Sequence, residues 1–100
     1  MASSTKVLAL GTLTVPVTSS SVKDTMPREV PPTLRLYLDG HMDQYWLRLD
    51  NTGVAFLMNT DTVDQAQALL EALPLAVSGL MTFEYILLGP LAPLGMLLHT

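Results

Sequence analysis

The chain has 100 residues, of which 49% are hydrophobic and 14% charged, and its formal net charge is −4. This length predicts a single domain, residues 1–100, and the acidic balance with only five scattered basic residues argues against a nucleic-acid partner. The absence of cysteine excludes disulfides, thiolate nucleophiles and Cys-ligated zinc or iron–sulfur clusters.

The N-terminal segment predicts a strand. Residues 6–15 carry apolar side chains on both sides of an extended chain, and several of them are β-branched. Gly11 and the threonines near it interrupt this run, so it lacks the continuous apolar core of a secretion signal. We therefore expect a flexible start over residues 1–5 and a cytoplasmic protein, which the lack of cysteine also fits.

A helix interrupted by proline is predicted next. Residues 22–38 place apolar side chains every three or four positions, which predicts one apolar stripe on a helix that ends at Gly40. Pro27, Pro31 and Pro32 lie inside this segment. Because proline lacks an amide donor and disfavours helical angles in the residue before it, we expect the helix to kink or to divide in two.

The middle of the chain predicts a hairpin and a second helix. Residues 41–60 divide into two strands around residues 51–53, which have the Asn-Thr-Gly composition of a tight turn. Asp61 is the predicted N-cap of the following helix, and Asp64 adds an acidic side chain to its first turn. Pro74 is expected to end that helix.

The most apolar stretch, LPLAVSGLMTFEYILLGPLAPLGMLL, covers residues 73–98, and Glu84 is its only charge. A helix that spans a bilayer needs about 20 continuous apolar residues, and proline and glycine interrupt this stretch too often for that. We therefore expect no membrane insertion. The predicted order is a helix end, a loop, a strand over residues 80–88 and an apolar C-terminal tail over residues 90–100.

The order β-α-β-β-α-β predicts an α+β protein with the ferredoxin-like arrangement, a four-stranded antiparallel sheet with two helices on one face. The strands are apolar on both sides and the polar surface is thin, so the second sheet face needs another cover. A second copy of the chain is the simplest cover, and it would form a dimeric α+β barrel around a cavity. Alternation along the strands places Gln44, Trp46, Arg48 and Glu84 on the cavity side.

The segment GVAFLMNTDTVDQAQALLEALPLAVSGLMTFEYILLGPL, residues 53–91, resembles the muconolactone isomerase-like branch of the dimeric α+β barrel superfamily. The resemblance is carried by the acidic cap and helix leading into LEALPL, by the strand FEYILLGPL and, more weakly, by YWLRLD. It implies a homodimer or higher homo-oligomer and a cofactor-free isomerase, or a relative of unknown activity. Small cyclic or aromatic-derived acids and lactones are the implied ligands, and Trp46 and Glu84 match the pattern.

Three residues are candidates for catalysis. Glu84 could act as a general base that moves a proton next to a carbonyl; the alternatives are an ion pair with Arg48 or an exposed side chain on an edge strand. Arg48 could hold a substrate carboxylate through its guanidinium, unless it is a solvated hairpin charge. His41 could titrate near neutral pH as acid or base, although a histidine at such a turn is more often a cap or a surface residue.

Three more residues are candidates for substrate binding. Trp46 and Gln44 would line the cavity, with packing as the alternative for the tryptophan. Glu29 precedes the proline pair that would turn it toward the cavity mouth; otherwise it is a solvated helix charge. His41 and His99 are too far apart in sequence to form a helical ligand pair, so no metal site is predicted. No Gly-rich phosphate loop is present, and no cofactor is expected.

The predicted function is a small cofactor-free isomerase or proton-transfer catalyst that acts on a small organic acid, lactone or polyketide-like ring bound in the barrel. Two alternatives remain open. One is a cofactor-free monooxygenase of the same superfamily, and the other is a non-catalytic dimer that binds a small ligand or has a structural role.

Overall fold

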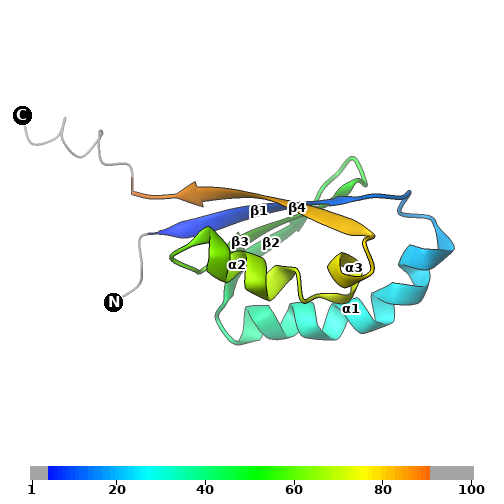
Figure 1. Ribbon diagram of the computed structural model, residues 1–100, viewed down its shortest axis with the longest axis horizontal. Helices are drawn as coiled ribbons and strands as arrows, with labels where there is room; N and C mark the ends of the chain where they lie inside the picture. The colour runs from blue at the N-terminus through cyan, green and yellow to red at the C-terminus, as the bar shows by residue number, and fades with distance from the viewer. Residues whose placement is uncertain (1–4, 91–100) are drawn as a thin grey trace, which may run out of the picture.

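A computed structural model of the chain describes residues 5–90 (Figure 1). The elements in chain order are β1 (Lys6–Leu13), α1 (Ser20–Leu38), β2 (Met42–Leu47), β3 (Gly53–Met58), α2 (Val63–Leu70), α3 (Pro74–Val77) and β4 (Met81–Leu88). The predicted flexible start and apolar tail fall outside the described residues, apart from Thr5 and Pro90.

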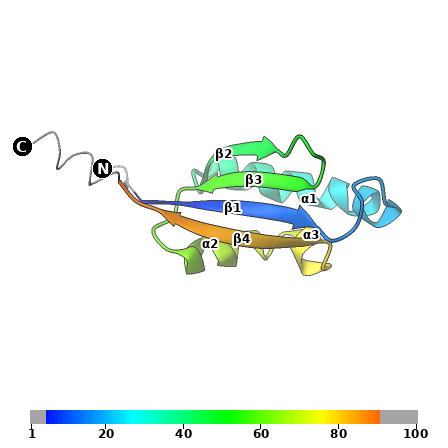
Figure 2. The same cartoon turned by 90° about the horizontal axis from the view of Figure 1, so that it is seen from above.

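The four strands form one open antiparallel sheet in the order β2-β3-β1-β4 (Figure 2). All helices of the described part lie on one face of this sheet (Figure 1). This confirms the predicted α+β class and is compatible with the ferredoxin-like arrangement, although three helices take the place of the expected two.

The core lies between the sheet and the helices. Residues directly opposite each other on neighbouring strands share a face, and Ala9 of the central strand β1 is opposite Phe56 on β3 and Tyr85 on β4. The largest cluster of buried side chains forms on this face and comprises Val7, Ala9, Met42, Phe56, Met58, Ala66, Leu70 and Leu73. The opposite face of the sheet has no helix against it within residues 5–90.

The prolines do not divide the first helix in two, so that one of the two expected outcomes was wrong: Pro27, Pro31 and Pro32 all lie inside the continuous α1. Pro27 and Pro31 are one turn apart and both are exposed. The carbonyl oxygens one turn earlier, at Lys23 and Pro27, lose an amide partner but remain on the solvent side, where water can bind them. The core-facing side of the helix is therefore less affected.

The second helical segment also differs from the prediction in two details. Thr62, not Asp61, is the N-cap of α2, and its side chain accepts a hydrogen bond of 3.1 Å from the amide of Gln65. α2 ends at Leu70, before Pro74 is reached. Pro74 instead begins α3, where its fixed φ and missing donor suit the first turn of a helix.

Candidate functional site

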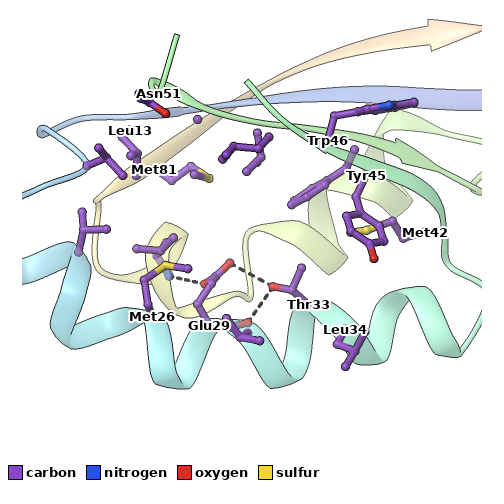
Figure 3. Close-up of a pocket in the computed structure, with 18 of the residues that line it drawn as sticks. Leu13, Met26, Glu29, Thr33, Leu34, Met42, Tyr45, Trp46, Asn51 and Met81 are labelled. Carbon is purple, nitrogen blue, oxygen red and sulfur yellow. Dashed lines mark hydrogen bonds between the residues drawn. The ribbon is translucent and has the colours of Figure 1, made fainter. Parts of the chain in front are cut away.

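A groove with a volume of about 450 Å³ lies between α1 and the edge strand β2 (Figure 3). We call it the helix–sheet groove. One wall is formed by α1, the other by β2, and the floor by apolar side chains of β3, β4 and α3. Among the described residues that line the groove, Glu29 alone has a charged side chain.

The α1 wall is formed by the apolar stripe that the sequence predicted on this helix. Met26, Val30 and Leu34 belong to this stripe, yet they are 38%, 52% and 48% exposed. Val22, at the start of the stripe, is buried, but the other buried positions of α1 are Thr25 and Glu29, which lie about a quarter of a turn from the stripe. As a result, the apolar stripe faces the groove and not the centre of the sheet.

The β2 wall is placed by an irregularity in the strand. The register of β2 against β3 shifts between Met42 and Gln44, after which Tyr45 lies opposite Phe56. Tyr45 therefore projects to the helix side, where its ring packs edge-on against Tyr37 of α1 with the ring centroids 5.3 Å apart. This aromatic pair joins the two walls at one end of the groove.

Glu29 is the buried polar group of the groove and is only 6% exposed. Its Oε1 accepts a hydrogen bond of 2.9 Å from the amide of Leu75 at the start of α3, while its Oε2 lies 3.2 Å from the hydroxyl of Thr33 (Figure 3). Within residues 5–90, the salt bridges are formed by other side chains, and Glu29 has no cationic partner there. Glu29 is therefore not a solvated helix charge. The groove that it borders lies on the helix side of the sheet, so its predicted place at the mouth of a barrel cavity stays a prediction.

The other predicted residues lie mainly on the open sheet face, the face that no helix covers in the described part. The register aligns Trp46, Ala55, Leu10 and Glu84 in one row across the four strands. Gln44 belongs to the neighbouring row, opposite Leu57 on β3. The assignment of these side chains from strand alternation therefore agrees with the register.

Arg48 and Glu84 are not brought together. Arg48 follows β2 at one edge of the sheet, whereas Glu84 lies on β4 at the other edge. The guanidinium of Arg48 donates to the Thr12 hydroxyl at 2.9 Å and is 3.6 Å from the Asp50 carboxylate. Glu84 is exposed, and the salt bridges of residues 5–90 do not include it, so the suggested Arg48–Glu84 ion pair is not formed.

His41 lies in the turn between α1 and β2, exposed and apart from Glu84. Its backbone amide donates to the carbonyl of Leu36 at 2.9 Å, and it borders a separate depression near Asn59 and Thr60. Trp46 borders the helix–sheet groove as well, although Figure 3 shows its indole on the opposite side of β2 from the Tyr45 ring. The structure thus brings Glu29 and Trp46 to one groove and leaves His41 elsewhere.

Within residues 5–90, two ionisable groups have clearly shifted pKa values, and both lie outside the groove. Hydrogen bonds from the Thr52 side chain and amide lower the pKa of Asp50 at the hairpin, and Arg48 adds a smaller effect. Burial raises the pKa of Tyr85 well above its usual range, and the hydrogen bond that its hydroxyl donates to Glu71 reinforces the effect. Both shifts have structural causes.

The sequence reasoning missed Tyr37, Tyr45 and Thr33 as groove residues. The sequence did offer the spacing of Met26, Val30 and Leu34. These exposed residues line the groove, whereas Val22 at the start of the same stripe is buried. The spacing alone could not show which element faces that stripe.

No protein-family model matches the chain, and no curated protein matches it at a significant level. The resemblance to the muconolactone isomerase-like branch therefore stays a prediction. A bilayer-spanning helix would have to be longer or more apolar than any that residues 5–90 form. Histidine, aspartate and glutamate side chains of this same part do not gather in groups of three as metal ligands would.

Proposed function

We propose that the protein binds a small, largely apolar organic molecule in the helix–sheet groove. The observation that carries this proposal is the groove itself, about 450 Å³ in volume and lined almost entirely by apolar side chains. Small-molecule sites in proteins commonly have volumes of about 300–1,000 Å³, apolar walls and a few polar groups that orient the ligand. Glu29 and Thr33 would supply such polar groups here.

A bound molecule would also remove an unfavourable exposure. Val30 and Leu34 on α1 and Leu47 on β2 are 52%, 48% and 65% exposed, and they face one groove from two sides. Covering apolar surface stabilises a complex by about 25 cal/mol for each Å² that leaves water. An apolar ligand between the two walls would gain this energy without moving the backbone.

The test compares two identical substitutions on one helix. Leu34→Glu places a charge on the groove wall, whereas Leu38→Glu places it at a position of α1 that is 71% exposed and does not line the groove. We expect isothermal titration calorimetry with 4-phenylbutan-1-ol to show binding to the wild type and to Leu38→Glu, and an affinity at least ~10-fold lower for Leu34→Glu. Equal affinity for both variants, or no binding to the wild type, would contradict the proposal.

A second candidate function is a homodimeric, cofactor-free proton-transfer catalyst of the isomerase type. It is favoured by the open sheet face, where Leu10 lies in the row that ends in Glu84, and Leu8 and Leu57 lie in the neighbouring row. Two copies that paired these faces would form the predicted barrel and would enclose the carboxylate. A carboxylate taken out of water becomes a stronger base, which suits proton removal from a small organic acid, lactone or polyketide-like ring.

This candidate is tested first by assembly. Ile86 lies on the open face, and Ile86→Lys would place a charge within the paired faces; Val77→Lys, on α3, is the matched control on another surface. Sedimentation velocity should show a dimer for the wild type and the control, and a monomer for Ile86→Lys. A wild type that stays monomeric at micromolar concentration excludes the barrel.

Catalysis itself would be tested with Glu84→Gln. The variant should keep the dimer and the fold, yet lose deuterium exchange from solvent into the carbon next to the carbonyl of a small lactone. Exchange that persists in the variant at the wild-type rate would remove Glu84 from the role of base.

A further inference from the structure

We infer that the ligand of the helix–sheet groove carries an ammonium group on an apolar body, an inference that rests on the proposed binding function. The inference rests on the surroundings of Glu29. Its carboxylate is more than nine-tenths buried, it is the only charged group lining the groove, and the ion pairs of residues 5–90 do not include it. A buried carboxylate is costly unless a cation or several hydrogen bonds compensate for the lost water.

The hydrogen bonds of Glu29 leave part of its capacity unused. Oε1 accepts from the Leu75 amide at 2.9 Å. The Thr33 hydroxyl has one proton to donate, and its oxygen lies 2.8 Å from the Glu29 backbone carbonyl oxygen and 3.2 Å from Oε2. Because an ionised carboxylate can accept about four hydrogen bonds, Oε2 retains room for a further donor.

The role of Glu29 at the start of α3 uses only one of its two oxygens. Holding the Leu75 amide requires one acceptor, which the side-chain amide of glutamine would also supply, although a carboxylate accepts the stronger hydrogen bond. The negative charge and the remaining acceptor positions are therefore available to something in the groove. A ligand ammonium would offer both a positive charge and several N–H donors.

The direction of the free oxygen sets how the ligand would lie. Oε2 points toward Thr33, one turn further along α1 (Figure 3). The next turn brings Tyr37, whose ring contacts Tyr45. An ammonium at Oε2 would thus extend its apolar body toward the aromatic end of the groove. An anionic ligand would place its charge beside Glu29 in an apolar setting, where like charges repel strongly.

Three probes that differ only in their polar end test the inference on the wild-type protein. They are 4-phenylbutylamine, 4-phenylbutan-1-ol and 4-phenylbutyrate, measured by calorimetry at neutral pH. We expect the amine to bind at least ~10-fold more tightly than the alcohol and the carboxylate to bind most weakly. Equal affinities, or tighter binding of the carboxylate, would overturn the inference but leave the groove as a ligand site. Absence of binding by all three would overturn the proposed function itself.

A charge-removing variant gives the second readout. Glu29→Gln keeps an acceptor for the Leu75 amide, so the amine should lose at least ~10-fold in affinity while the alcohol changes little. Asp24→Asn is the control, because it removes one carboxylate from an exposed position of the same helix. An amine affinity that is the same in Glu29→Gln as in the wild type overturns the inference. If Glu29→Gln does not fold, the probe series on the wild type decides.

Discussion

Glu29 and Glu84 occupy environments opposite to those that their sequence neighbours suggest. Glu84 lies in the most apolar stretch of the chain, yet it is exposed on the open sheet face. Glu29 lies among prolines and an arginine, yet it is 6% exposed and borders the helix–sheet groove. Burial of a side chain depends on what packs opposite it, which neighbours along the chain do not determine.

The two surfaces that carry these carboxylates also differ in shape. The groove is bounded by α1 on one side and β2 on the other, so it can enclose a small molecule. The open face is a single layer of strands without a second wall in the described part, so it suits an extended partner such as another sheet. Four predictions test this contrast, beginning with the largest expected effect.

Alanine substitutions at the two carboxylates should have very different effects on stability. Glu29→Ala would leave the buried Leu75 amide without its acceptor and create a small void, which should lower the free energy of unfolding by about 2–4 kcal/mol. Glu84→Ala should change it by less than about 0.5 kcal/mol, as is usual for surface residues. Urea denaturation of both variants measures the difference. Equal effects would mean that the two environments are alike.

Pro31→Ala should stabilise the α1 wall of the groove. An alanine amide could bond the carbonyl of Pro27, and proline in a helix interior costs about 3 kcal/mol relative to alanine. Greater freedom of the unfolded chain offsets about 1 kcal/mol of this gain, so the free energy of unfolding should rise by about 1–2 kcal/mol. Pro16→Ala, in the loop before α1, is the control and should not be stabilising. A destabilised Pro31→Ala variant would show that the proline is needed there.

Tyr85 should make the helix side of the sheet sensitive to alkaline pH. Its pKa is raised in the folded state, first by burial and then by Glu71, so its stabilising effect is present below the unfolded pKa of about 10 and is lost as the pH rises above it. Tyr85→Phe should lower the free energy of unfolding by about 0.5–1.5 kcal/mol at neutral pH and should weaken the alkaline decline. Tyr37→Phe serves as the control for thermal melts across this range. The same alkaline decline in Tyr85→Phe as in the wild type would assign the effect to another group.

Asp50 should make the hairpin beside the open face slightly sensitive to acid. Because hydrogen bonds from Thr52 lower its folded-state pKa, its contribution is present above the unfolded value of about 3.9 and is lost as the pH falls below it. Asp50→Asn should therefore melt at a slightly lower temperature than the wild type at neutral pH and at the same temperature in strong acid. A difference that grows toward acid pH would have the wrong sign.

Alternation along strands was a reliable guide to this fold. Phe83 and Tyr85 pack against the core while Glu84 between them faces outward, as a period of two requires. The same rule placed Gln44 and Trp46 on the open face, because the register shift in β2 occurs before Gln44. These features depend on local geometry that the sequence specifies.

The groove could not be predicted from the sequence, because it depends on how α1 is oriented over the sheet, which no local pattern specifies. Whether the stripe of Met26 and Leu34 becomes core or wall is decided by the rotation of α1 over the sheet, which long-range contacts set. That rotation buries Thr25 and Glu29, and Val22 is the one member of the stripe that is buried with them. The prediction that the prolines divide α1 failed for a related reason. The energetic cost of a proline inside a helix depends on whether the carbonyl that loses its amide partner faces water.

Trp46 has an optical consequence. It is the only tryptophan of the chain and is 46% exposed, on a strand that separates the groove from the open face. Its indole lies toward the open face, while other atoms of the residue border the groove. Pairing of two open faces should therefore shift its fluorescence emission to shorter wavelength, whereas a ligand in the groove should have a smaller effect. A single chromophore would then report dimerisation and ligand binding as separable signals.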